Sequence, residues 1–305
     1  MDPARILKSP LRRIDGFTLI EAVMVIVITG IIAGIVSVFI VNPVKGYADS
    51  VKRAELTDQA DLIGRRFARE IHIALPNSLR VKDSSGNVGS CAAQPSVTCF
   101  IEFIMTGGGG RYRDAADGSS SGNFLSFTTG NLTFDVLGPM PSNPAIAVGD
   151  YIVVYNLGPG YAPADAYAPG DPCTNCNRAK VSQAPVGNLV TLTSNPFASQ
   201  APPLPSPNGS FQVVPGGVKA VTYACPTVTP GNLTRYWNYG FNASLATTPS
   251  GTSALLASNI SCVVAPYSST NASSKGLLTI TLTLLDPTSN EKVTLVREIH
   301  VDNAP

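Results

Sequence analysis

The sequence predicts an α+β protein in which a long N-terminal stem helix packs on an antiparallel β-sheet head. Three observations support this prediction. An uncharged apolar run of 20 residues lies near the N-terminus, helical spacing of apolar residues follows it, and short β-type runs fill the remainder. The chain of 305 residues has 27 glycines and 25 prolines, and only 13% of its residues are charged. This composition favours short strands joined by many turns over a helical bundle.

The apolar run covers residues 22–41 and is interrupted only by Thr29, Ser37 and two glycines. At about 1.5 Å per residue it spans about 30 Å, the thickness of the hydrocarbon core of a bilayer. A cleaved signal peptide would have an apolar region of about 7–15 residues, followed by a cleavage site of small residues. This run is longer, and no such site follows it. We therefore expect residues 17–41 to be the transmembrane part of the stem helix.

Charge predicts the orientation of this segment. The net charge of the chain is only +1, and its first 16 residues carry four basic against two acidic side chains, Arg5, Lys8, Arg12 and Arg13 against Asp2 and Asp15. Basic flanks of a membrane span stay in the cytoplasm. We therefore expect a single-pass membrane protein whose residues after Val41 lie outside the membrane, with the lipid bilayer as a partner. A net charge near zero indicates no nucleic-acid surface, so no nucleic-acid partner is expected.

Residues 42–76 are expected to form the amphipathic part of the stem helix. Pro43 lacks a backbone donor, so we expect a kink or a short melted stretch at Asn42-Pro43. Pro76-Asn77 is expected to end the helix. Between these points apolar residues recur every three or four positions, at Leu56, Ala60, Ile63, Phe67, Ile71 and Ala74. One face of this half should therefore pack on the head.

Residues 77–305 are expected to form an exported, β-rich globular head. Residues 277–285 alternate between apolar and polar, and the turn residues 286–290 join them to 292–301 as a hairpin. The other β-type runs are residues 98–105, 124–137, 151–155, 189–194, 211–214, 218–223 and 261–264. Two long irregular segments, 157–177 and 195–209, are expected to be surface loops. They are either binding elements or tolerated insertions, and we favour insertions.

All six cysteines follow the apolar run, in the part expected to be exported, where disulfides form and persist. A zinc site is the alternative, but the chain has one C-x-x-C segment and both histidines lie elsewhere, so disulfides are favoured. Among the connectivities open to six cysteines, we favour pairing between neighbours along the chain. The expected pairs are Cys91 with Cys99, Cys173 with Cys176, and Cys225 with Cys262.

Apparent catalytic motifs do not indicate an enzyme. Residues 118–122 match G-x-S-x-G, but a nucleophile elbow needs a strand before it, a helix after it and a histidine base. Here a Gly/Ser loop precedes the motif, and the chain has only His72 and His300. We interpret both histidines as packed or surface residues. We expect no catalytic residues, no cofactor and no metal site.

The most specific signal crosses the end of the basic segment, where the sequence reads Ile14-Asp15-Gly16-Phe17-Thr18-Leu19-Ile20-Glu21. The string GFTLIE resembles the class III signal of type IV prepilins, type II secretion pseudopilins and competence pseudopilins. The resemblance implies that residues 1–16 are a leader peptide and that a prepilin peptidase cuts between Gly16 and Phe17. It also implies that Phe17 becomes the N-methylated terminus of the mature protein.

Glu21 needs a physical explanation, because an ionisable side chain at mid-bilayer costs about 2.5–3.5 kcal/mol on insertion scales. It lies one helical turn, about 6 Å, from the terminus that cleavage would expose. Its carboxylate can neutralise the Phe17 ammonium of its own chain or of a neighbour, and the resemblance implies the neighbour. The alternative is a carboxylate at the lipid interface near a helix start, where the dipole favours it. We favour the pairing, which makes Glu21 an assembly residue.

The head also resembles large minor pilins, of the mannose-sensitive haemagglutinin (MSHA) and PilW types, and pseudopilin J, at residues 256–262 and 297–305. The resemblance implies a minor pilin that helps to initiate or cap a type IV pilus by packing its helix with other pilins. The implied partners are major and minor pilins, the prepilin peptidase and the inner-membrane assembly platform. The alternatives are a minor pseudopilin of a type II secretion system and a pilus-tip adhesin that uses Tyr161, Tyr167 and Trp237.

Overall fold

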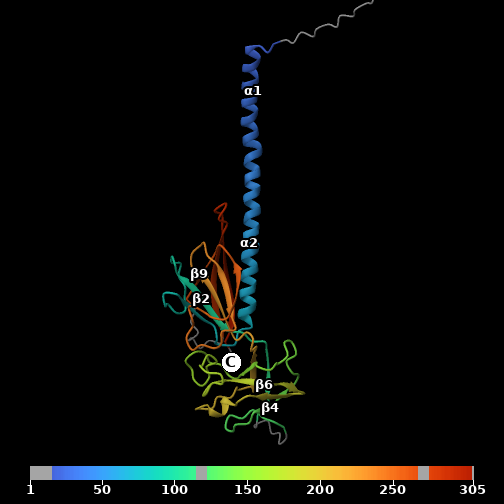
Figure 1. Ribbon diagram of the computed structural model, residues 1–305, viewed down its shortest axis with the longest axis vertical. Helices are drawn as coiled ribbons and strands as arrows, with labels where there is room; N and C mark the ends of the chain where they lie inside the picture. The colour runs from blue at the N-terminus through green and yellow to red at the C-terminus, as the bar shows by residue number, and fades with distance from the viewer. Residues whose placement is uncertain (1–15, 115–121, 267–274, 304–305) are drawn as a thin grey trace, which may run out of the picture. The chain divides into compact units, whose positions relative to one another are not determined.

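A computed structural model describes residues 16–114, 122–266 and 275–303 (Figure 1). The chain divides into two compact units, residues 1–52 and residues 53–305, and each is described by itself. Of the expected leader, only Gly16 falls among the described residues. Residues 118–121 of the G-x-S-x-G segment lie outside them.

The first unit is helical from Leu19 onward. It contains α1 (Leu19–Val36), the π-helical segment η1 (Ser37–Val41) and the start of α2 (Asn42–His72). The expected melted stretch at Asn42-Pro43 is wrong, because both residues are helical. The irregularity lies in the π-helical turn just before Pro43. A wider turn there accommodates a proline that has no N–H to donate and whose ring would crowd the preceding carbonyl.

The apolar side chains of the first unit are not covered by the protein itself. No residue of α1 is buried, and Ile26 is 71% exposed. Among the described residues, one continuous helical stretch, Leu19–His72, is long and apolar enough by length and composition to cross a membrane. The exposed apolar surface is what a bilayer would cover.

In the second unit, the buried face of α2 carries all the predicted apolar residues except Ala74, which lies beyond the helix and is partly buried, and it also carries Gly64 and Glu70. The helix ends at His72, four residues before the predicted end. The chain leaves the helix there because its backbone pairs with a strand instead: Leu75 N donates to Ile104 O at 2.8 Å, and Thr106 N donates to Ile73 O at 2.9 Å.

Two antiparallel sheets pack with α2, where a single sheet was expected. The first has the order β1-β2-β9-β10-β11 and the second the order β12-β13-β14. Their bounds are β1 (Arg80–Asp83), β2 (Thr98–Ile104), β9 (Ala220–Pro226), β10 (Leu233–Trp237), β11 (Thr252–Ala257), β12 (Ile260–Val264), β13 (Lys275–Leu285) and β14 (Lys292–Asp302). Side chains of α2 and of both sheets share one hydrophobic core, with Phe67 and Tyr223 at 4.2 Å between ring centroids. The strands β13 and β14 form the predicted hairpin.

The remaining strands close into a six-stranded barrel that the sequence did not predict. Its order is β3-β4-β7-β6-β5-β8, and the 3-10 helix η3 (Pro196–Ser199) follows β7. The strands are β3 (Gly108–Tyr112), β4 (Thr133–Leu137), β5 (Tyr151–Val153), β6 (Arg178–Val186), β7 (Leu189–Leu192) and β8 (Ser210–Val214). The barrel has its own core, which includes Phe134 and Phe211.

The barrel is an insertion between two strands that pair directly. The ladder between β2 and β9 runs to Ile104 opposite Ala220, and all six barrel strands lie between these residues in the sequence. The insertion begins next to the C-terminal end of α2, where Leu75 and Thr106 make the hydrogen bonds described above. A third apolar cluster, including Leu75, Ile104 and Tyr151, packs at this junction.

Candidate functional site

The described part of the predicted processing site is exposed. Gly16 precedes α1, and Phe17 is 69% exposed. A Cβ at Gly16 would have no heavy atom within 4 Å, and the residue lacks the positive φ that would demand glycine. The fold itself therefore does not require glycine at this position. Any such requirement would come from an enzyme that acts here, and processing stays a prediction.

Glu21 belongs to a capping box at the start of α1. Thr18 is the N-cap residue, and its hydroxyl accepts a hydrogen bond from Glu21 N at 3.3 Å. In return, Thr18 N donates to the Glu21 carboxylate at 3.5 Å. The pair satisfies two donors that a helix start leaves without partners. The sequence signal for this capping box is the S/T-x-x-E spacing from Thr18 to Glu21, and we did not predict it.

The capping box keeps the Glu21 carboxylate at the helix N-terminus, where the dipole stabilises negative charge. The side chain is nevertheless exposed, so a second helix can reach it. Both interpretations of Glu21, an interfacial carboxylate and the partner of a neighbouring Phe17 ammonium, are compatible with this geometry. The pairing role stays a prediction.

Three disulfides lie in the head, and they join Cys91 to Cys99, Cys173 to Cys176 and Cys225 to Cys262. These are the pairs expected from the sequence, and no cysteine of the chain is left free. The Cys225–Cys262 bridge links β9 of the first sheet to β12 of the second. It therefore ties the two sheets together covalently.

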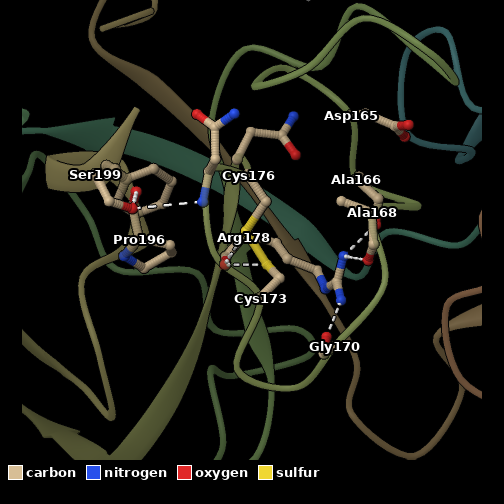
Figure 2. The surroundings of a disulfide bond; sticks show 12 residues. Asp165, Ala166, Ala168, Gly170, Cys173, Cys176, Arg178, Pro196 and Ser199 are labelled. Carbon is tan, nitrogen blue, oxygen red and sulfur yellow. Dashed lines mark hydrogen bonds between the residues drawn. A yellow bond between two sulfur atoms is a disulfide. The ribbon is translucent and has the colours of Figure 1, made fainter. Parts of the chain in front are cut away.

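The segment 157–177 is more than a surface loop, which corrects our expectation. Figure 2 shows Arg178 reaching the carbonyl oxygens of this segment: it donates to Ala166 O at 2.8 Å, to Ala168 O at 2.6 Å and to Gly170 O. Arg178 is only 3% exposed and also packs over the Phe241 ring. The Cys173–Cys176 disulfide closes the same segment next to this arginine. The segment is thus held inside the head by a buried cation and a covalent bond.

A second buried network holds the other side of this segment. The Arg80 guanidinium lies 3.8 Å from the Tyr167 ring centroid and pairs with the fully buried Glu102. Burial raises the pKa of Glu102, and the Arg80 charge opposes that rise. Tyr239 donates to the same carboxylate at 2.8 Å. Tyr167 is therefore a core residue, whereas Tyr161 is 52% exposed and Trp237 is partly buried.

The two histidines line one surface hollow together with Asp302. Both are exposed, and they come from the end of α2 and from β14. Within the described ranges, no group of three or more His, Cys, Asp or Glu side chains is arranged to hold a metal ion. The expectation that the chain is not an enzyme stays a prediction.

The comparisons with known proteins agree with the N-terminal geometry. The family model described as the prokaryotic N-terminal methylation motif matches residues 11–37. This range contains Gly16, Phe17, Glu21 and the whole of α1. No curated protein and no solved structure matches the chain. These findings support a type IV pilin-like protein with a prepilin-type motif, followed by an apolar helix long enough to cross a membrane.

Proposed function

We propose that this protein is a non-enzymatic minor pilin that helps to initiate or cap the assembly of a type IV pilus. Within that class, we propose a protein similar to the mannose-sensitive haemagglutinin pilus biogenesis protein MshO, the PilW-type minor pilins and pseudopilin J. The prepilin-type motif supports the class. Segments 256–262 and 297–305 of the head support the finer assignment.

The position of the barrel is the main observation that supports this proposal. Subunits of such a filament pack through parallel helices, so each new subunit lies displaced along the helix direction. The barrel begins where Leu75 meets Ile104, at the C-terminal end of α2. Mass added beyond that end occupies the space that the next head along the filament would need. A subunit at the end of the filament has no neighbour on that side, so this geometry favours a terminal subunit over a shaft subunit.

The N-terminal residues have the following roles in this proposal. The prepilin peptidase cuts between Gly16 and Phe17 and methylates Phe17. The chain sits once in the inner membrane with its head in the periplasm until it enters the filament. The Glu21 carboxylate then neutralises the Phe17 ammonium of an adjacent major or minor pilin, and the assembly platform drives the extraction of the helix from the bilayer.

A labelled barrel tests the proposed position in the filament. Val186 is 80% exposed at the end of β6, so a Val186→Cys variant offers an accessible thiol. The unsubstituted chain is the matched control, because all its cysteines are in disulfides. Gold-labelled maleimide should mark one end of sheared pili from the variant and none from the control. Label spread along the shaft would contradict a terminal position.

Gene deletion separates the two alternative functions. Loss of protein secretion with normal pili would identify a pseudopilin of a type II secretion system. Normal pilus number with lost surface attachment would identify a tip adhesin. Of the aromatic residues first considered for a ligand, Tyr167 is buried, so an adhesin would have to use exposed residues such as Tyr161. The proposal expects pilus number itself to fall.

A further inference from the structure

A cavity of about 370 Å³ lies between α2 and the β11 end of the first sheet. The helix contributes Leu62, Arg66 and Arg69, and the sheet contributes Tyr223 and Leu256. Leu62 is 69% exposed, so the helix side of the cavity presents an apolar side chain to solvent. Side chains of the second unit alone form this cavity.

The floor of the cavity holds a hydroxyl without a partner. Tyr223 is fully buried, and no described residue accepts a hydrogen bond of ordinary geometry from its hydroxyl, although the Glu70 carboxylate lies close enough to interact with it. Burial first, and then the charge of the Glu70 carboxylate, raises the pKa of Tyr223. The tyrosine is therefore a neutral donor at physiological pH. A buried donor without an acceptor costs about 1–3 kcal/mol, so an acceptor placed in the cavity would recover that free energy.

The charges around the cavity favour an anion. Glu70 is already engaged by two arginines: Arg235 Nε donates to Glu70 Oε2 at 2.9 Å, and Arg66 Nε donates to Glu70 Oε1 at 3.3 Å. Arg69 lines the cavity and has no hydrogen bond or ion pair within the described part of the chain. The local excess is thus positive, and the guanidinium of Arg69 is available to a carboxylate.

The neighbouring strand favours a peptide as the source of that carboxylate. β11 is an edge strand that pairs with β10 alone, so its outer backbone groups lack a strand partner. Leu256 of this strand lines the cavity, while Leu255 points away and is 59% exposed. An extended peptide can add to such an edge through main-chain hydrogen bonds while its alternate side chains enter an adjacent pocket.

We propose that β11 and the adjacent cavity bind an extended segment of a partner protein, whose acidic side chain enters the cavity between apolar neighbours. The carboxylate pairs with Arg69 and accepts a hydrogen bond from the Tyr223 hydroxyl. The apolar side chains cover Leu62 and Leu256. This interaction does not depend on the position of the chain in a filament.

The probe is a fluorescein-labelled peptide Thr-Leu-Thr-Glu-Thr-Leu-Thr, whose Leu and Glu side chains share one face when extended. Its anisotropy is measured with the full-length protein in detergent. The matched peptide has Gln in place of Glu. The Glu peptide should bind about tenfold more tightly, because a hydrogen bond to a charged acceptor is stronger than one to a neutral acceptor. Equal affinity for the two peptides, or no binding of either, would overturn the proposal.

Variants of the protein test whether the peptide binds at this cavity. Arg69→Gln should abolish the preference for the Glu peptide, and Tyr223→Phe should weaken binding about fivefold while keeping the ring in the core. Arg65→Gln is the control, because Arg65 lies on the same helix, pairs with Asp61 and does not line the cavity. Decanoate is added as a competitor. If the protein binds decanoate tightly but binds neither peptide, the cavity is a fatty-acid site instead.

Discussion

Cys99 of β2 and Cys225 of β9 are direct partners across the ladder of the first sheet. Each forms a disulfide that leads out of this ladder, Cys99 to Cys91 and Cys225 to Cys262. The backbone of Cys91 in turn exchanges two hydrogen bonds of 3.0 Å with Val264 of β12. Both bridges therefore fasten the first sheet to the same strand of the second sheet.

The Cys225–Cys262 bridge should contribute about 2–4 kcal/mol to the free energy of unfolding, because it closes the longest disulfide loop, a separation of 37 residues. The double Ala variant of this pair should lose more stability than that of Cys173 and Cys176, which are 3 residues apart. Urea unfolding of both variants in detergent measures the difference. Recovery of Cys225 and Cys262 as free thiols, or the reverse order of stability, would refute the assignment.

Arg178→Met should loosen the segment 157–177 selectively. The variant keeps most of the side-chain volume but leaves three carbonyl oxygens without their donor, and each such loss costs about 1–3 kcal/mol. Hydrogen exchange of the backbone amides in this segment should accelerate at least tenfold. Lys180→Met is the control, because the neighbouring Lys180 makes a partly exposed ion pair with Asp171 and a cation–π contact with Tyr151 but donates to none of these carbonyls. Unchanged exchange in Arg178→Met would mean that the arginine does not hold the segment.

Tyr112 should make the barrel sensitive to alkaline pH. Burial raises the pKa of Tyr112 from 10.0 to about 12 in the folded state. Below pH 10 the Tyr112 hydroxyl keeps its proton in both the folded and the unfolded state, so the free energy of unfolding is not reduced. Between pH 10 and 12 the Tyr112 hydroxyl loses its proton only in the unfolded state. The free energy of unfolding therefore falls by about 1.4 kcal/mol per pH unit. Unfolding curves at successive pH values should show a smaller alkaline loss in Tyr112→Phe than in the unsubstituted protein. An identical loss in both would contradict the prediction.

Glu21→Ala should impair filament incorporation without lowering the amount of protein in the membrane. The substitution removes a charge from the lipid, so insertion should not suffer. Thr18→Ala is the control, because it also breaks the capping box but leaves the carboxylate in place. If the carboxylate serves assembly, only Glu21→Ala should reduce the number of pili. An equal defect in both variants would show that Glu21 acts as a capping residue.

The α2 face and the disulfide pairs were predictable because their signals are local. Apolar spacing marks Phe67 and Ile71, but it does not reveal the buried Glu70, whose burial depends on Arg235 from a distant strand. The barrel was not predictable either, because its strands pair across long distances in the sequence. Its strand β3 begins with three glycines and pairs with β8, about a hundred residues away, so no local alternation marks it. Tyr167 is likewise buried by distant segments, which include Arg80 over its ring and the third apolar cluster.

The mass of the mature N-terminal peptide tests the central claim most directly. The protein should be purified from cells that express a prepilin peptidase, and its N-terminal peptide analysed by mass spectrometry. We expect a peptide that begins at N-methylated Phe17. We also expect full-length precursor in a Gly16→Glu variant, whose fold has room for the side chain at this position. An unprocessed N-terminus in the unsubstituted protein, or cleavage after the apolar run, would contradict the claim that this is a prepilin.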